Sequence, residues 1–174
     1  AFVNSAVKSK QLTAYTNPQK SDVYIICVPT PFIIENETPQ PDLSFVFKAL
    51  DSVAHLLEAG DTLILESTSP VGTTESLKNR LLELGINTAL LNIAYCPERV
   101  LPGNIMVELL ENDRIVGGID ADSSHKVKLF YESFISGKVY TTDSKTAEAC
   151  KLIENAYRDV NIALANEISI LCEQ

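Results

Sequence analysis

The chain has 174 residues, of which 45% are hydrophobic, and its formal charge at pH 7 is −9. This length and this apolar content predict one soluble globular domain with a proper hydrophobic core. The excess of acidic side chains argues against nonspecific binding to nucleic acid or to an anionic membrane, so neither is expected as a partner.

The four cysteines, Cys27, Cys96, Cys150 and Cys172, show no C-x-x-C spacing and have no pair of histidines nearby. We therefore expect neither a metal site nor a disulfide framework. Three of the four lie within apolar runs, which favours small buried side chains that remain reduced. With no apolar stretch of the ~20 residues that a membrane helix needs, the sequence predicts a cytoplasmic protein.

The first twelve residues, AFVNSAVKSKQL, lack Met and place their apolar side chains close to helical spacing. This pattern predicts a helix that has been entered midway, and so a fragment of a longer protein. A short β-branched run, VYIICV at 23–28, then predicts a strand that is covered on both faces. After a Pro-rich loop, the apolar spacing over 43–57 predicts a helix with Asp42 as its cap and Gly60 at its end.

The same signals then recur along the chain. TLILES at 62–67 predicts a strand, and Gly72 with Thr73 opens a helix that Gly85 ends. TALLNIAYC at 88–96 predicts the next strand, and the segments RIVGGI and KVYTT bracket a further helix. This alternation predicts an α/β fold: a partial, doubly wound, Rossmann-like parallel sheet with helices on both faces, followed by a long helix.

The terminal segment has neither Gly nor Pro and predicts that long helix. Its main apolar seam consists of Ile153, Tyr157, Val160, Leu164, Ile168 and Leu171. Further apolar residues lie off this seam, so we expect one face of the helix to pack on the α/β domain and another on a partner subunit or a following domain.

Three of the predicted strands end in polar segments that contain proline: CVPTP, ESTSPVGTT and YCPERVLPG. Ligands of open parallel sheets bind beyond the carboxyl ends of the strands, where these three segments should meet. Each segment also has a purely structural interpretation: a proline that stops a strand, a helix entry capped by Thr73 or Thr74, or a surface ion pair of Glu98 and Arg99. Lys151 and Asn155 share a helix face opposite the seam, which is either a solvated face or part of the same site.

These segments carry a resemblance. DVYIICVPTPF, ESTSPVGTT, AYCPERVLPGN and KTAEACKLIENAYRDVNIALANE, in this order, resemble the UDP-glucose/GDP-mannose dehydrogenase family over nearly the whole chain. The resemblance implies NAD as cofactor and a UDP-sugar substrate, whose primary alcohol is oxidised twice through an aldehyde and a cysteine-bound thioester. The wording CPERVLPG is most similar to the branch that oxidises UDP-N-acetyl-D-mannosamine. The alternatives are a UDP-N-acetylglucosamine or UDP-glucose dehydrogenase, and a non-catalytic module for nucleotide binding or dimerisation.

The resemblance also assigns roles. Glu98 is expected as general base or water activator, Thr68 as the hydroxyl that holds this water, Lys151 beside the developing oxyanion and Asn155 as its support. Arg99 is expected at the cofactor or the substrate phosphates. The stiff Pro-rich loop is expected to form a wall for the cofactor. The full set of expected cofactor contacts is Val28, Pro29, Thr30, Pro31, Ser67, Thr68, Glu98 and Arg99.

Two parts of the family pattern do not occur in this sequence, the G-x-G-x-x-G phosphate loop and the Gly-rich segment around the catalytic cysteine. Cys150 and Cys172 lie in an apolar helix and are not expected to replace that cysteine. The resemblance therefore implies that 1–142 is the C-terminal part of an NAD-binding domain. It implies that 143–174 begins a central connecting and dimerisation helix of a homodimer.

Overall fold

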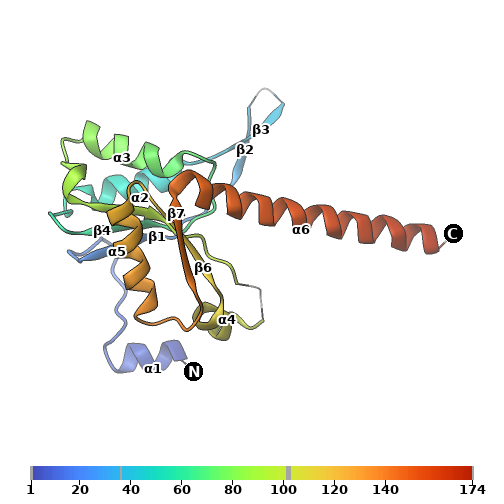
Figure 1. Ribbon diagram of the computed structural model, residues 1–174, viewed down its shortest axis with the longest axis horizontal. Helices are drawn as coiled ribbons and strands as arrows, with labels where there is room; N and C mark the ends of the chain where they lie inside the picture. The colour runs from blue at the N-terminus through green and yellow to red at the C-terminus, as the bar shows by residue number, and fades with distance from the viewer. Residues whose placement is uncertain (1, 36, 101–102, 174) are drawn as a thin grey trace.

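The computed structural model describes residues 2–35, 37–100 and 103–173. A five-stranded sheet with the strand order β1-β4-β5-β6-β7 forms its centre (Figure 1). The strands of this sheet are β1 (Val23–Ile26), β4 (Thr62–Leu65), β5 (Asn92–Tyr95), β6 (Arg114–Gly118) and β7 (Val139–Asp143). The helices are α1 (Phe2–Lys8), α2 (Ser44–Ala54), α3 (Thr73–Glu83), a 3₁₀ turn at Thr88–Leu90, α4 (Ile105–Glu111), α5 (Ala121–Glu132) and α6 (Ser144–Cys172). The α/β fold with a terminal long helix is thus confirmed.

The sheet is mostly, and not entirely, parallel. β1, β4 and β5 are parallel neighbours, but β6 runs antiparallel to β5, with Ala94 opposite Gly118. The expectation of an all-parallel sheet was wrong at this point. The chain leaves β5 at its carboxyl end and passes through α4, which buries none of its described side chains and does not cross the sheet. Because β6 starts from the edge where β5 ended, it has to run back through the sheet.

Two hydrophobic cores lie on the two faces of the sheet. On one face α2, α3 and the first turns of α6 cover the strands with Val46, Leu50, Leu77, Leu81 and Ala147. On the other face α5 packs Val127, Tyr131 and the following Ile135 against Ile64, Ala94 and Val116. Figure 1 shows these two layers above and below the strands. This double cover explains why β4 is buried along its whole length.

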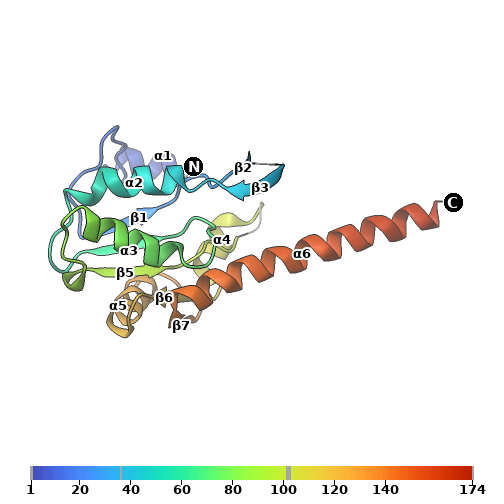
Figure 2. The same ribbon diagram turned by 90° about the horizontal axis from the view of Figure 1, so that it is seen from above.

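Helix α6 leaves the body of the protein soon after it begins. Of its described residues, those that are buried belong to the first two turns: Ser144, Ala147 and Glu148. Figures 1 and 2 show the rest of the helix projecting from the sheet. The six seam residues are between 51% and 72% exposed. The expected contact of α6 with the α/β domain is therefore restricted to its start.

The Pro-rich loop after β1 contains an antiparallel hairpin that the sequence did not predict. It consists of β2 (Phe32–Glu35) and β3 (Thr38–Pro41), with Phe32 opposite Pro41. It projects toward the same end of the molecule as α6 (Figure 2). At its base, the Asp42 amide donates to the Pro31 carbonyl at 2.7 Å.

Helix α2 also differs in detail. Asp42 accepts a hydrogen bond from the Ser44 amide at 2.8 Å, but Leu43 occupies the capping position. The helix ends at Ala54, before Gly60, whose φ of +96° turns the chain toward β4.

The four cysteines are free thiols, but burial was expected for three of them and only Cys96 is fully buried. Cys96 is buried and Cys150 is half-buried, whereas Cys27 and Cys172 are exposed. Cys27 lies at the end of the edge strand β1, and Cys172 lies on the projecting part of α6, where no core covers it.

Candidate functional site

The loops after β1 and β4 are fastened together by hydroxyl groups. The Ser67 hydroxyl accepts a hydrogen bond from the Val28 amide and lies within donating distance of the Val28 carbonyl, each at 2.8 Å. Further along, the hydroxyl of Thr30, two residues after Val28, donates to the carbonyl of Thr68, the residue after Ser67, at 2.7 Å. Pro29 and Pro31 are exposed beside these contacts. The loop that contains these two prolines is thus held by Val28 before them and by Thr30 between them.

A pocket of about 270 Å³ opens where β1, β4 and β5 end. It is lined by Cys27, Val28, Glu66, Ser67, Thr68 and Glu98. The structure therefore brings together four of the expected site residues, from three different loops, at the sheet edge where they were expected. The pocket is smaller than a usual ligand site of ~300–1,000 Å³, so it is too small for a whole dinucleotide.

Glu66, which lines this pocket and which the sequence analysis did not single out, is the centre of a polar cluster. The Tyr131 hydroxyl donates to Glu66 Oε1 at 2.6 Å, and the Arg114 guanidinium lies 3.7 Å from the same oxygen. Arg114 also lies over the Tyr131 ring, 4.8 Å from its centroid. The Cys27 thiol donates to Glu66 Oε2 at 3.2 Å. Desolvation, and then the Glu66 carboxylate, raise the pKa of the Cys27 thiol to about 12, so this thiol is a poor nucleophile.

A second residue that sequence reasoning missed, Glu148, fastens α6 to the rest of the site. Its carboxylate is 0% exposed and accepts hydrogen bonds from the Gly72 amide at 2.5 Å, the Thr74 amide at 2.8 Å and the Thr74 hydroxyl at 2.6 Å. Helix α3 begins at Thr73 without a side-chain cap of its own, so the expected cap at Thr73 or Thr74 was wrong. A carboxylate at the amino end of a helix is stabilised by the free amides and the helix dipole.

The sequence did contain a signal for Glu148. It lies three residues before Lys151 and seven before Asn155, so these three polar residues share one face of α6. Since Glu148 is buried against α3, this face begins inside the protein, beside the loop that carries Thr68.

Lys151 and Asn155 open toward different hollows. Lys151 lines a hollow of about 680 Å³ between α4 and α6, and its Nζ donates to the Glu98 carbonyl at 2.6 Å. Asn155 lines a hollow of about 580 Å³ together with Thr30 and Thr68. The side chain of Lys151 therefore contacts the backbone of the Glu98 loop, whereas Asn155 lies next to the Thr68 loop.

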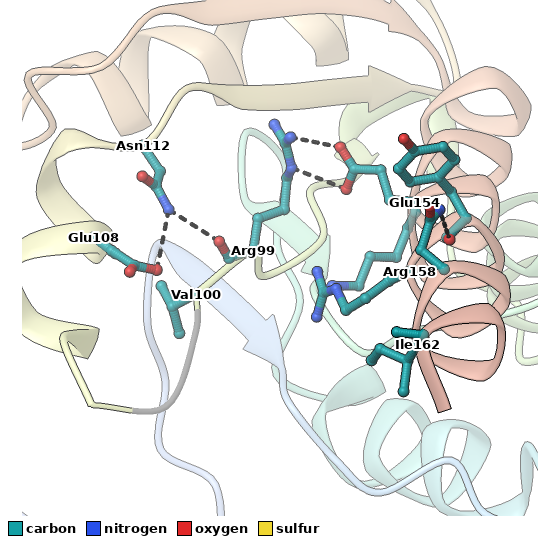
Figure 3. A pocket seen from close by; sticks show the side chains of 11 residues that line it. Arg99, Val100, Glu108, Asn112, Glu154, Arg158 and Ile162 are labelled. Atoms are coloured by element: carbon teal, nitrogen blue, oxygen red, sulfur yellow. Dashed lines mark hydrogen bonds and ion pairs between the residues drawn. The ribbon is translucent and has the colours of Figure 1, made fainter. Parts of the chain in front are cut away.

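The side chain of Arg99 is held by the protein itself (Figure 3). Its guanidinium forms a two-point ion pair with Glu154 on α6, with distances of 3.1 Å from Nε and 2.5 Å from Nη2. A third contact goes to the Asp113 carbonyl at 3.1 Å. The Glu98 carboxylate accepts a hydrogen bond from the Val100 amide of its own loop.

Comparison with protein families agrees with this geometry. Residues 1–135 match the NAD binding domain of the UDP-glucose/GDP-mannose dehydrogenase family, and residues 145–174 match the central domain of that family. The chain belongs to this family. No helix in the described part of the chain is long and apolar enough to cross a membrane.

Similar proteins include UDP-N-acetyl-D-mannosamine dehydrogenase of Methanocaldococcus jannaschii, which is 48% identical over 99% of this chain and 40% of its own length. NDP-N-acetyl-D-galactosaminuronic acid dehydrogenase of Ralstonia solanacearum is 45% identical over 99% of this chain and 42% of its own length. Among solved structures, the native UDP-N-acetyl-mannosamine dehydrogenase Cap5O from Staphylococcus aureus is 42% identical with a TM-score of 0.85, covering 97% of this chain and 41% of that chain. The chain thus spans about two fifths of the length of these relatives.

Proposed function

We propose that this chain is part of an NAD-dependent nucleotide-sugar dehydrogenase that oxidises the C6 hydroxyl of UDP-N-acetyl-D-mannosamine to a carboxylate in two steps. The observation that carries the proposal is the pocket at the ends of three parallel strands, where Thr68 and Glu98 meet. The similarity to UDP-N-acetyl-D-mannosamine dehydrogenases favours this substrate over the unacetylated UDP-sugars. In this reading 1–142 is the C-terminal part of the cofactor domain, and 143–174 begins the central helix.

Each of the expected site residues has its own role in the proposed reaction. NAD supplies the hydride acceptor when it is bound, against the wall formed by Val28 to Pro31. Glu98 takes a proton or activates water, and Thr68 holds that water. Lys151 and Asn155 stabilise the negative charge that develops on the substrate oxygen, because a fixed cation in a site that excludes water is worth most there. The resemblance places the nucleophilic cysteine in a Gly-rich segment that does not occur in this sequence, and the raised pKa of the Cys27 thiol, about 12, makes Cys27 a poor substitute.

The experiment is NADH absorbance with the full-length gene product, supplied in turn with UDP-N-acetylmannosamine, UDP-N-acetylglucosamine, UDP-glucose and GDP-mannose. We expect turnover with the first sugar and two NADH per sugar. Another preferred sugar would contradict the subtype, and no reaction with any of them would favour a non-catalytic nucleotide-binding module. The isolated 174-residue chain is expected to be silent, since it contains no G-x-G-x-x-G loop.

Lys151 offers the sharpest single test. Lys151→Met is expected to lower kcat by ~10²–10³-fold with little change in folding, as is typical for loss of one oxyanion partner. The matched control is Lys145→Met on the first turn of the same helix, where the lysine forms an exposed ion pair with Glu75 at 3.0 Å. Near-normal turnover of Lys151→Met would mean that Lys151 takes no part in the reaction and only belongs to a solvated helix face.

We also infer that the full-length protein is a cytoplasmic homodimer in which the seam of α6 is covered. Its six apolar side chains are at least 51% exposed here, which is more apolar surface than a helix usually leaves in water. Leu164→Asp is therefore expected to shift the sedimentation of the full-length protein to that of a monomer. Asn166→Asp, which adds the same charge on the opposite face of the helix, is the control, and a dimer that survives Leu164→Asp would contradict the inference.

A further inference from the structure

The ion pair between Arg99 and Glu154 lies where α6 separates from the body of the protein. Glu148 is the last of the buried residues of α6, and Glu154 follows it by six residues, or ~9 Å of helix. Beyond Glu148 no core packing holds the described part of the helix, so its position relative to the Glu98 loop depends on polar contacts. Two of these contacts reach the loop: Lys151 to the Glu98 carbonyl, and Glu154 to the Arg99 guanidinium.

The pair also connects the loop to its other neighbour. Besides Glu154, the Arg99 guanidinium contacts the Asp113 carbonyl at 3.1 Å, just before β6. The Arg99 carbonyl accepts a hydrogen bond from the Asn112 side chain at 3.0 Å. Arg99 therefore ties together α6, the loop and the start of β6, and it follows Glu98 directly in sequence. Its planar fork is well suited to this task, because it meets a carboxylate at two points and fixes direction as well as distance.

We propose that the Arg99–Glu154 pair is a latch that positions the Glu98 loop against α6, and that Arg99 and Glu154 are positioning residues of the reaction. The inference rests on the proposed function, because it takes Glu98 and Lys151 as the groups that have to be held in register. It gives Arg99 a role other than binding the phosphates of cofactor or substrate. A guanidinium whose two outer edges already meet Glu154 and the Asp113 carbonyl would have to give up such contacts to bind a phosphate.

The two roles predict different kinetics in the full-length gene product. If the pair is a latch, Arg99→Met and Glu154→Gln each lower kcat about tenfold or more, because small misplacements of reacting groups are costly. KM for NAD and for the sugar stays within about threefold, since no ligand contact is lost. The double variant is no worse than either single variant, because both remove the same interaction. Arg99→Lys, which keeps the charge but not the fork, recovers only part of kcat.

A matched pair elsewhere in the chain controls for the loss of an ion pair as such. Arg80 on α3 meets Asp51 on α2 at two points, each at 3.0 Å, with similar exposure and away from the site. Arg80→Met and Asp51→Asn are expected to change kcat by less than about twofold. Equal losses of kcat in the control and latch variants would overturn the proposal.

Two further results would overturn the latch. The first is a Glu154→Gln variant with normal kcat beside an Arg99→Met variant with strongly raised KM, which would make Arg99 a ligand contact. The second is a double variant whose loss is the product of the two single losses, which would mean that the residues act independently.

Amide hydrogen exchange makes the test independent of turnover. The Val100 amide donates to the Glu98 carboxylate, so its exchange reports the order of the loop. Glu154→Gln is expected to speed this exchange about tenfold or more, as local opening becomes easier, whereas Asp51→Asn leaves it unchanged. If the wild-type protein oxidises none of the sugars, the proposed function fails, and this exchange alone decides the latch: faster exchange supports it and unchanged exchange overturns it.

Discussion

Replacement of Glu148 tests how α6 is attached to the start of helix α3. The carboxylate is 0% exposed, and so is Thr74. The carboxylate accepts hydrogen bonds from the Thr74 amide at 2.8 Å and from the Thr74 hydroxyl at 2.6 Å. Glu148→Ala leaves these two donors buried without a partner, at ~1–3 kcal/mol each. A hydrogen bond to a charged group is worth ~1.5–3 kcal/mol, and two of them are lost here. We therefore expect the free energy of unfolding to fall by about 3–5 kcal/mol, and Tm of a chain of this size to fall by roughly 6–20 °C.

Glu148→Gln should have a smaller effect. Its side-chain oxygen can keep both bonds to Thr74, but its NH₂ group then faces the Gly72 amide, which donates to a carboxylate oxygen at 2.5 Å in the wild type. One unpaired donor at a half-buried position predicts a loss of about 1–3 kcal/mol. Urea unfolding of the 174-residue chain, followed by far-ultraviolet circular dichroism, measures the free energy of unfolding of both variants and shows which is less stable.

Glu75→Ala is the control, because Glu75 lies on the same helix α3 and its side chain is 51% exposed in an ion pair with Lys145. The loss expected there is below about 1 kcal/mol. If Glu148→Ala cost no more than Glu75→Ala, the reasoning that a buried carboxylate anchors α6 would be refuted.

Two other predictions concern single positions. Iodoacetamide at about pH 8 is expected to label Cys172 well before Cys27. Glu66→Gln is expected to speed the labelling of Cys27, because it removes a carboxylate that raises the pKa of this thiol. Mass spectrometry measures both rates, and a Cys27 rate that Glu66→Gln leaves unchanged would contradict the role of Glu66. Gly117→Ala is expected to destabilise the protein by about 1–3 kcal/mol or more, because the added Cβ would lie 2.6 Å from the Cβ of Ala147 on α6. Urea unfolding measures this loss, and an unchanged midpoint would mean that α6 does not pack this closely on β6.

Much of the fold follows from patterns within single segments. The strands β1, β4 and β5 are short runs of mostly apolar residues, and the spacing of apolar side chains in α2, α3 and α6 is helical. The direction of β6 could not be read in this way, because it depends on where the preceding connection lies and not on the strand itself. The hairpin β2–β3 was hidden by Pro39 and Pro41, which cannot donate to a sheet and are tolerated here because the hairpin has two strands only.

The site was predictable only as far as each residue follows a strand end. Val28, Ser67, Thr68 and Glu98 were expected at one sheet edge, and they line one pocket. The roles of Glu66, Glu148 and Glu154 depend on partners that lie far away in the sequence: Arg114, Thr74 and Arg99. An acidic residue between alanines looks like a solvated helix position until the helix that it meets is known.

The position of Lys151 and Asn155 depends first on the start of α6, whereas the Arg99–Glu154 pair holds the Glu98 loop against the helix. Gly117 allows the helix to approach β6, and Glu148 fixes it against the amino end of α3, so the helix axis is held from two directions. Lys151 and Asn155 then lie ~4.5 and ~10.5 Å further along a stiff helix, near enough to inherit the position of the anchor. Activity lost in a Glu148 variant should therefore exceed what its stability alone explains, and it should appear in kcat rather than in KM. A variant that is destabilised by 3–5 kcal/mol but keeps normal kcat while folded would show that Lys151 is placed by its contact with the Glu98 loop instead.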